Sequence, residues 1–264
     1  IFVGNGSDEP IDLVYRVFCE PKVHNAVAIA PTYSMYKVAA EINDVEVREV
    51  QLEEDFSLDA DKLLAATDAN TRLLWLCSPN NPTANSFPTG IIREFAGIVV
   101  LDEAYIDFAA EPGFLSRLGE FPNLIVLQTL SKAWGMAGLR LGLAFADPLI
   151  VATLSNVKYP YNVNGPTQQT VLERLAGSPA AQVAEILSER RRVAAALQPM
   201  KVVRKLYPSD ANFVLVKVDE PRKVYDRLIA AGIIVRDRSR MQGCEGCLRI
   251  TIGTPEENTR LLEV

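Results

Sequence analysis

Hydrophobic residues in the first part of the chain fall into short runs that alternate with segments of helical spacing. The runs predict strands at residues 1–3, 26–30, 45–50, 73–76, 98–101, 124–127 and 141–146. Helices are expected after residues 4–7, after residues 31–33, at 59–66 and near 91–95. Since most of these strands are apolar throughout and are interleaved with helices, we expect an α/β fold in which helices sandwich a mostly parallel central sheet.

The pattern changes in the last third of the chain. From about residue 179 a long charged helix leads into strands at 213–218, 233–235 and 248–252, with a helix near 222–231. This order predicts a smaller α+β unit. We therefore divide the chain into a large domain, residues 1–185, and a small C-terminal domain, residues 186–264. The run Arg190-Arg191-Arg192 in the charged helix is more typical of a solvated helix face than of a binding patch.

Composition narrows the class of protein. The formal net charge of −6 argues against nucleic acid or an anionic membrane as the main partner. No apolar run approaches the length of a membrane span and no signal peptide is visible, so a cytoplasmic location is expected. Cys244 and Cys247 form a C-x-x-C pair, but a zinc site needs two further ligands and His24 is the single histidine. Free thiols are therefore favoured over metal or redox chemistry, and no metal is expected.

Charged side chains follow two of the predicted strands, where ligands of a parallel sheet gather. Asp102 comes directly after residues 98–101, and a buried acid there is costly unless a cationic partner meets it. Lys132 lies in TLSKAWGMAGLRLG, after residues 124–127, among small, aromatic and apolar neighbours that would desolvate its amine and lower its pKa. Each residue alone is better explained as a turn aspartate or an ordinary loop lysine.

Taken together, these groups match one cofactor. Ser131 and Arg140 lie close to Lys132 in the sequence, and Gly4-Asn5-Gly6-Ser7-Asp8 opens a helix whose N-terminus can bind a phosphate. A lysine amine, a buried acid and a phosphate site are what pyridoxal 5'-phosphate requires. The lysine would form a Schiff base, and the acid would keep the ring nitrogen protonated.

Five stretches, in order, carry a family resemblance: GNGSDE, PTYSMY, SPNNPT, DEAY and TLSKAWGMAGLRLG. They resemble the fold-type-I, class II aminotransferases over essentially the whole chain. With GIIVRDR and CLRITIG, the resemblance is nearest to the histidinol-phosphate aminotransferases. It implies a pyridoxal-phosphate-dependent transferase that is a homodimer. The implied reaction, in histidine biosynthesis, converts L-histidinol phosphate and 2-oxoglutarate into imidazole-acetol phosphate and glutamate.

The resemblance also implies a role for each site residue. Lys132 would form the Schiff base and then carry a proton between substrate and cofactor carbons, while Asp102 would pair with the pyridinium nitrogen. The other implied cofactor contacts are Asn81 and Tyr105 on the phenolic oxygen, Tyr33 stacked on the ring, and Ser7, Asp8, Ser131 and Arg140 on the phosphate. Arg249 would bind the anionic end of the substrate, and Arg236 would complete a site for a phosphate dianion. From spacing alone, surface pairs of these two arginines with Asp237 or Glu245 are equally good.

Two departures from the family and several alternative functions stay open. Ala84 follows NNPT where relatives usually have glycine, which could strain the turn. The sequence begins without Met inside a predicted strand, so the N-terminal arm that supplies tyrosines to the substrate and to the neighbouring subunit appears as a missing segment. The enzymatic alternatives are an aromatic amino-acid aminotransferase and a phosphothreonine-type decarboxylase. A non-enzymatic effector domain that binds pyridoxal phosphate is a further one.

Overall fold

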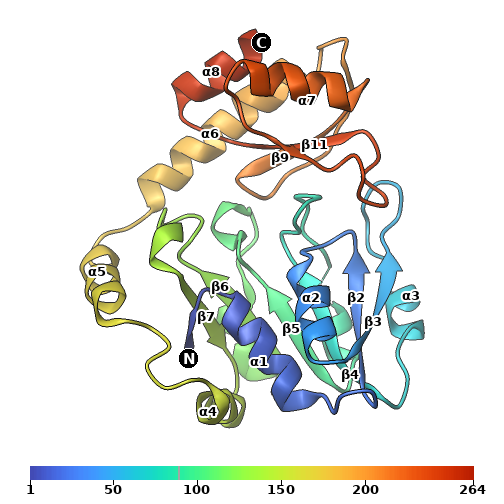
Figure 1. Ribbon diagram of the computed structural model, residues 1–264, viewed down its shortest axis with the longest axis vertical. Coiled ribbons are helices and arrows are strands. Elements are labelled where there is room, and N and C mark those ends of the chain that lie inside the picture. Colours follow the sequence, from blue (N-terminus) through green and yellow to red (C-terminus); the bar gives the residue numbers. More distant parts are fainter. Residues whose placement is uncertain (89) are drawn as a thin grey trace.

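Two β-sheets, one above the other, organise the chain (Figure 1). The computed structural model describes residues 1–88 and 90–264. The larger sheet has the order β1-β7-β6-β5-β4-β2-β3 and the smaller one the order β10-β11-β9-β8. The strands of the larger sheet are β1 (Phe2–Asn5), β2 (Asn25–Ala30), β3 (Glu46–Gln51), β4 (Thr71–Cys77), β5 (Ile98–Asp102), β6 (Leu124–Thr129) and β7 (Leu141–Phe145). Those of the smaller sheet are β8 (Val203–Leu206), β9 (Phe213–Val218), β10 (Arg236–Asp237) and β11 (Cys247–Thr251).

Helices cover both faces of the larger sheet and one face of the smaller sheet. The α-helices are α1 (Asp8–Phe18), α2 (Met35–Ile42), α3 (Ala60–Ala65), α4 (Pro148–Val157), α5 (Gly165–Leu175), α6 (Ala180–Leu197), α7 (Pro221–Ala230) and α8 (Pro255–Glu263). Short 3-10 helices are η1 (Gly90–Arg93), η2 (Ile106–Phe108), η3 (Phe114–Glu120) and η4 (Ala137–Leu139). None of the helices in the described ranges is both long and apolar enough to cross a membrane.

The larger sheet is mostly parallel, as the sequence predicts. β2 pairs in parallel with β3 and β4, β4 with β5, and β5 with β6. β7 runs antiparallel to both of its neighbours, β6 and β1. The reason is the short connection between β6 and β7, which turns straight back and leaves no room for a crossover helix.

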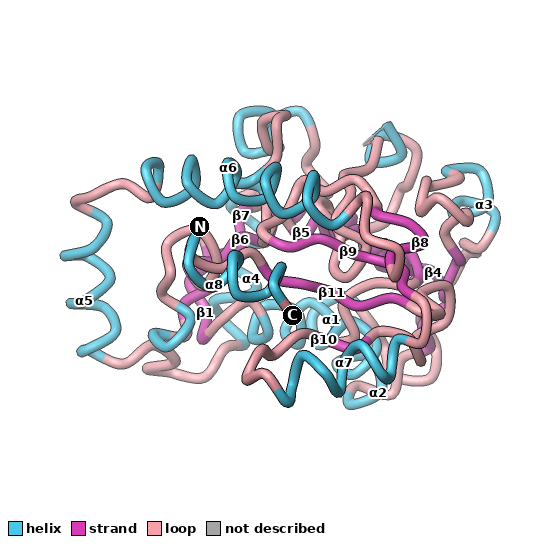
Figure 2. Tube along the Cα trace, turned by 90° about the horizontal axis from the view of Figure 1, so that it is seen from above, coloured by secondary structure: helices cyan, strands magenta, loops and turns pink. Residues whose placement is uncertain are grey.

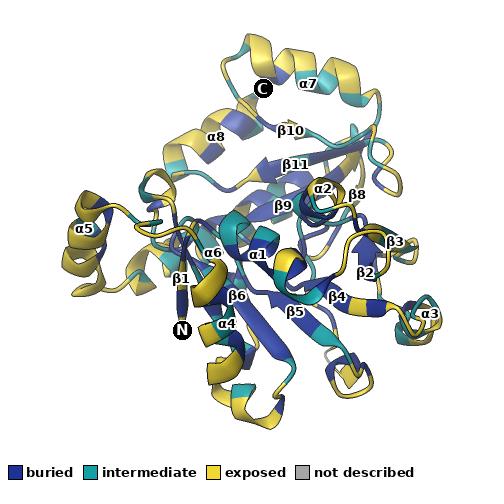
Figure 3. Cartoon of the chain, turned by 60° about the horizontal axis from the view of Figure 1, so that its bottom comes forward, coloured by how far each residue is buried: buried dark blue, intermediate teal, exposed yellow. Residues whose placement is uncertain are grey.

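Alternate residues of each central strand enter opposite helical layers, which explains the unbroken apolar runs. In β4, Leu73 and Trp75 pack in the layer that α1, α2 and α4 contribute to, whereas Leu74 and Leu76 pack with Leu63 of α3 and with the 3-10 helices. The strands are therefore buried on both faces, while α5 is largely exposed (Figure 3).

The smaller sheet also has two different faces. Val214 and Val216 of β9 belong to a core formed with α6, α7 and α8. Phe213 of the same strand packs against Tyr105, which follows β5, and Leu215 packs against Phe56. Viewed from above, α6 runs along the molecule and α5 lies at one edge (Figure 2). This second face holds the two sheets together next to the carboxyl end of β5.

Three sequence predictions need correction. The helix near 91–95 is the 3-10 helix η1, which serves to bury Ile91 and Ile92. Residues 233–235 are not a strand: the pairing with β11 starts one residue later at Arg236, and Ile234 points to solvent at 81% exposure. Arg190 does not belong to a solvated face, because it donates hydrogen bonds to the carbonyls of Phe108 and Ala211. α4, α5, α8 and β8 were not predicted.

Candidate active site

A cavity of about 360 Å³ lies at the carboxyl ends of three adjacent parallel strands. The last residues of β4, β5 and β6, which are Cys77, Asp102 and Thr129, all line it. Every residue that the sequence assigns to the site also lines this one cavity: Ser7, Asp8, Tyr33, Asn81, Asp102, Tyr105, Ser131, Lys132, Arg140, Arg236 and Arg249. Sequence positions from 7 to 249 therefore converge on a single site.

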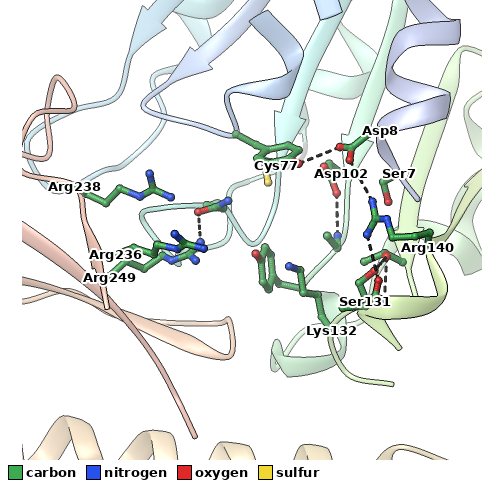
Figure 4. Close-up of a pocket in the computed structure, with 16 residues that line it drawn as sticks. Ser7, Asp8, Cys77, Asp102, Ser131, Lys132, Arg140, Arg236, Arg238 and Arg249 are labelled. Carbon is green, nitrogen blue, oxygen red and sulfur yellow. Dashed lines mark hydrogen bonds and ion pairs between the residues drawn. The ribbon is translucent and has the colours of Figure 1, made fainter. Parts of the chain in front are cut away.

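Lys132 stands between two charged sides of the cavity (Figure 4). It lies in the connection from β6 to β7, and its Nζ is 5.3 Å from the ring centroid of Tyr105. Burial lowers the pKa of its amine, and the positive charge of Arg249 lowers that pKa further. The desolvation predicted from its small and apolar neighbours is confirmed, and the residue is disposed to act as a free amine.

Asp102 is a buried acid at 3% exposure, and no Lys or Arg of the described chain forms an ion pair with it. Its Oδ2 accepts a hydrogen bond from the Tyr36 hydroxyl at 2.7 Å and its Oδ1 accepts one from the Ala104 N–H at 3.0 Å. Burial raises the pKa of this carboxyl, and the two hydrogen bonds act in the opposite direction. Its environment is therefore suited to a cationic ligand group.

The small residues around Lys132 let several backbone segments meet at one corner. A side chain at Gly142 of β7 would collide with the backbone N of Ser7, at the start of α1. The Ser7 hydroxyl donates to the carbonyl of Gln128 at 3.4 Å, and the Thr129 hydroxyl donates to Ser131 Oγ at 3.0 Å. Hydroxyls and the N-terminus of α1 thus gather around one space, which is the arrangement of an anion site.

Arg140 supplies the positive charge of this corner. Its backbone adopts the left-handed conformation, with φ of 53°, and a side chain at Gly6 would lie 2.6 Å from its guanidinium. Its Nη2 is 3.5 Å from Asp8 Oδ2, while Tyr33 donates its hydroxyl to Asp8 Oδ1 at 3.0 Å. The Asp8 side chain is occupied by these two partners. Asp8 would therefore bind an anion through its backbone N–H.

The opposite side of the cavity carries three guanidinium groups (Figure 4). Arg236 of β10 lies directly opposite Arg249 of β11 in the antiparallel register, and Arg238 follows two residues later. Arg249 Nη1 donates to Asn81 Oδ1 at 2.6 Å, and its Nε is buried without a hydrogen-bond partner in the described chain, as is Nε of Arg238. Like charges opposite each other destabilise a sheet, so this cluster is suited to an anionic ligand.

The surface pairs with Asp237 or Glu245 are not formed. Asp237 instead accepts hydrogen bonds from the backbone and side chain of Ser239, and Glu245 accepts one from the N–H of Gly243. Within residues 1–88 and 90–264, neither Arg236 nor Arg249 is in an ion pair.

Five lining residues were missed from the sequence: Cys77, Ala104, Thr129, Ala137 and Arg238. A signal existed for Arg238, because it is a second arginine two residues after Arg236, which was already assigned to the site; β10 ends at Asp237, and both arginines line the cavity. Cys77 and Thr129 could have been found as the residues that end buried strands next to Asp102. All four cysteines are free, and the described residues contain no group of three or more His, Cys, Asp or Glu that could hold a metal ion.

Ala84 bears out the strain expected from the missing glycine. Its φ of 70° lies in the left-handed region, and its side chain is fully buried among Tyr105, Phe108 and Phe213. An L-residue in this conformation costs about 1–2 kcal/mol. The surrounding packing therefore holds this turn, next to Asn81, in a strained state.

The parallel-centred sheet, the strand-end lysine and the buried acid define a fold-type-I pyridoxal-phosphate enzyme, and solved structures agree. The histidinol-phosphate aminotransferase of Clostridium acetobutylicum superimposes with a TM-score of 0.90 at 23% identity, over 99% of this chain and 81% of that chain. That of Sinorhizobium meliloti, in complex with pyridoxal-5'-phosphate, gives a TM-score of 0.87 at 24% identity, over 100% and 74%. At this identity the likeness shows the fold.

Sequence comparison gives the family. The profile "Aminotransferase class I and II" matches residues 1–264. A histidinol-phosphate aminotransferase of Parabacteroides distasonis is 55% identical over 268 aligned residues, which are 99% of this chain and 78% of that protein. The chain belongs to the class I and II aminotransferase family. This membership confirms the predictions of a transferase and of pyridoxal 5'-phosphate as its cofactor.

Proposed function

We propose that this chain is an aminotransferase that exchanges the amino group of L-histidinol phosphate with 2-oxoglutarate, giving imidazole-acetol phosphate and glutamate in histidine biosynthesis. The observation that carries the proposal is the division of one cavity. Lys132, Asp102 and an anion-binding corner lie on one side, and three arginines without carboxylate partners in the described chain lie on the other. The first side suits the cofactor and the second suits a phosphorylated substrate. The identity of 55% to a protein of that name supports the same substrate.

The residues fit pyridoxal phosphate. A buried carboxylate that lacks a cation in the described chain suits a protonated ring nitrogen, and the corner formed by Ser7, Ser131 and Arg140 suits a phosphate. The cavity volume of about 360 Å³ is within the range of about 300–1,000 Å³ for small-molecule sites. When bound, the cofactor supplies an electron sink for the pair released at the substrate's α-carbon.

The chain's own groups then have distinct tasks. Lys132 would hold the cofactor and, as an amine, would move a proton at the substrate's α-carbon. Burial and the positive charge of Arg249 lower its pKa, which favours the free amine that this transfer needs. Asn81 and Tyr105 would hydrogen-bond the phenolic oxygen. Tyr33 would stack on the ring, and Asp8 would contribute the N–H of the first residue of α1.

The arginines determine the substrate class. Arg236 and Arg249 face each other across β10 and β11, and together they offer charge for a dianion, which one guanidinium cannot neutralise. Arg238 adds a third guanidinium group to the lining of the cavity. The single carboxylate of an aromatic amino acid would compensate only part of this charge, so the phosphate monoester is the better fit.

Substrate discrimination tests the proposal. Glutamate formation from 2-oxoglutarate is measured with L-histidinol phosphate and with L-phenylalanine as amino donor, and carbon dioxide release is measured with phosphothreonine. The proposal requires the highest kcat/KM for L-histidinol phosphate. Faster turnover of phenylalanine, or carbon dioxide release, would replace it by the corresponding alternative.

A matched pair of variants localises the phosphate site. Arg236→Ala should raise KM for L-histidinol phosphate by about tenfold or more and change that for glutamate less, because a charged hydrogen bond contributes about 1.5–3 kcal/mol. Arg240→Ala is the control, since Arg240 is exposed, lies in the same segment and does not line the cavity. Equal losses for both substrates would indicate general anion binding at Arg236.

Three further features belong to the proposal. A homodimer is supported by a second, apolar cavity of about 570 Å³ beside β1 and α5, where Leu172 is 71% exposed. Light scattering tests it. A cytoplasmic location is supported by the free cysteines, which a reducing compartment maintains.

The domain boundary at residues 185 and 186 is supported by α6, whose later residues Val193 and Leu197 pack in the core of the smaller sheet.

A further inference from the structure

Tyr36 is a buried residue outside the cavity lining that touches Asp102 directly. Its hydroxyl donates to Asp102 Oδ2 at 2.7 Å, and its side chain is 1% exposed. The other hydrogen bond to this carboxylate comes from the Ala104 N–H, on Oδ1. Each oxygen of the acid thus has one protein donor in the described chain, and Tyr36 is the only side chain among them.

The phenol ring is held on several sides. Tyr36 stacks on Trp75 with ring centroids 4.7 Å apart and an angle of 17° between the planes, and Trp75 stacks in turn on Tyr15 at 5.4 Å. Tyr33, which lines the cavity, meets Tyr36 edge to face at 5.7 Å. Because these rings come from α1, α2, β4 and the turn before α2, the packing of one helical layer fixes where the hydroxyl points.

This geometry bears on the charge of Asp102. A donor on a carboxylate favours its anionic form, whereas burial favours the neutral form. Burial and the neighbouring Asp102 charge raise the pKa of Tyr36 well above its ordinary value, so its hydroxyl keeps its proton and remains a donor. Of the other titratable groups near Asp102, Lys132 favours the anion by its charge and Asp8 opposes it. Glu103, Cys77, Tyr33 and Tyr105 also interact with the Asp102 charge.

We propose that Tyr36 is a positioning residue, whose hydroxyl keeps the Asp102 carboxylate in the anionic, oriented form that a protonated cofactor nitrogen requires. The inference rests on the proposed function, because it concerns how the chain holds its cofactor. Without this donor, Asp102 binds a proton more readily, and the proton shared with the ring nitrogen moves toward the carboxyl.

Tyr36→Phe tests the proposal, and Tyr15→Phe is its matched control. Both substitutions remove one hydroxyl from a fully buried ring of the same aromatic stack, but the Tyr15 hydroxyl has no hydrogen-bond partner in the described chain. The protein is loaded with pyridoxal phosphate labelled with nitrogen-15 in the ring. The nitrogen chemical shift reports whether that nitrogen carries a proton, and a cofactor titration gives the dissociation constant.

We expect the nitrogen shift of Tyr36→Phe to move toward the value of a neutral pyridine, and its dissociation constant for the cofactor to rise about tenfold, the lower end for a charged hydrogen bond. Tyr15→Phe should match the unsubstituted protein in both. Tyr36→Phe and Tyr15→Phe giving the same shift and the same constant would overturn the inference while leaving the proposed function intact. Failure of the unsubstituted protein to bind pyridoxal phosphate would overturn the proposed function and this inference with it.

A double-mutant cycle separates a role through Asp102 from general packing. In an Asp102→Asn background, Tyr36→Phe should change the dissociation constant by less than about twofold; a full tenfold change there would contradict the proposal. Should Tyr36→Phe not fold, tyrosine labelled with carbon-13 at Cζ gives the answer in the unsubstituted protein. The Tyr36 resonance should move when the cofactor binds, and an unmoved resonance would refute the inference.

Discussion

Arg190 connects two segments next to the active site, one ending at Phe108 and one at Ala211, and the stability lost on its removal can be calculated. Its Nη1 donates to the carbonyl of Ala211 at 2.7 Å and to that of Phe108 at 3.3 Å. Phe108 ends the 3-10 helix η2 that follows Tyr105, and Ala211 precedes β9, whose Phe213 meets the Tyr105 ring edge to face at 5.2 Å. One side chain of α6 therefore ties together the two segments that carry this contact.

Arg190→Met keeps most of the apolar stem and removes both hydrogen bonds. Both bonds come from one nitrogen, Nη1, and we count them together as one charged hydrogen bond, which contributes about 1.5–3 kcal/mol. We therefore expect a loss of about 2 kcal/mol in the free energy of unfolding, and a melting temperature lower by about 4–8 °C. Urea unfolding followed by circular dichroism measures the loss. Arg191→Met is the control, because Arg191 is exposed and should stay within about 0.5 kcal/mol. Equal urea midpoints of unfolding for the two variants would refute the stabilising role assigned to the Arg190 hydrogen bonds.

Three further predictions address the turn and the lysine. The free energy of unfolding of Ala84→Gly should stay within about 1 kcal/mol of that of the parent protein, since relief of strain offsets the lost methyl. Ala84→Val should lose more than about 2 kcal/mol. Thermal melting measures both, and a larger loss for the glycine variant would contradict the strain. Arg249→Met should raise the pKa of Lys132, because it removes a positive charge that lowers this pKa. Acylation of Lys132 in the cofactor-free protein, measured by mass spectrometry at a series of pH values, should then require a higher pH. An unchanged pH dependence of acylation would contradict an effect of Arg249 on Lys132. Lys132→Ala should abolish transamination while leaving the melting temperature within about 3 °C, and near-normal turnover would exclude Lys132 as the catalytic amine.

The central sheet and the site could be predicted from the sequence because both depend on strand ends. Buried strands such as 73–76 and 98–101 are marked by apolar runs, and polar residues that follow parallel strands must meet at one edge. Asp102 and Lys132 were found in this way. Their roles as Schiff-base lysine and as partner of the ring nitrogen followed from their chemistry, and the resemblance added the proton transfer by Lys132. The structure adds their surroundings: the pKa of Lys132 is lowered, and Asp102 accepts a hydrogen bond from a tyrosine.

The elements that were missed lack a strong apolar period. α5 buries only Thr167 and Val171, so its sequence resembles a polar loop. Capping signals were nevertheless present: Asn164 accepts a hydrogen bond from the Thr167 N–H, and Thr254 and Glu257 form a capping box at the start of α8. The contact of Tyr36 with Asp102 could not be predicted, because it depends on how α2 packs against β5, far away in the sequence.

The visible absorbance spectrum of the protein loaded with pyridoxal phosphate, recorded before and after addition of L-histidinol phosphate alone, tests the central claim most directly. The account predicts a cofactor band that requires Lys132 and is bleached by L-histidinol phosphate, as the amino group passes to the cofactor. A band that forms with the lysine intact but responds to L-phenylalanine and not to L-histidinol phosphate would contradict the proposed substrate.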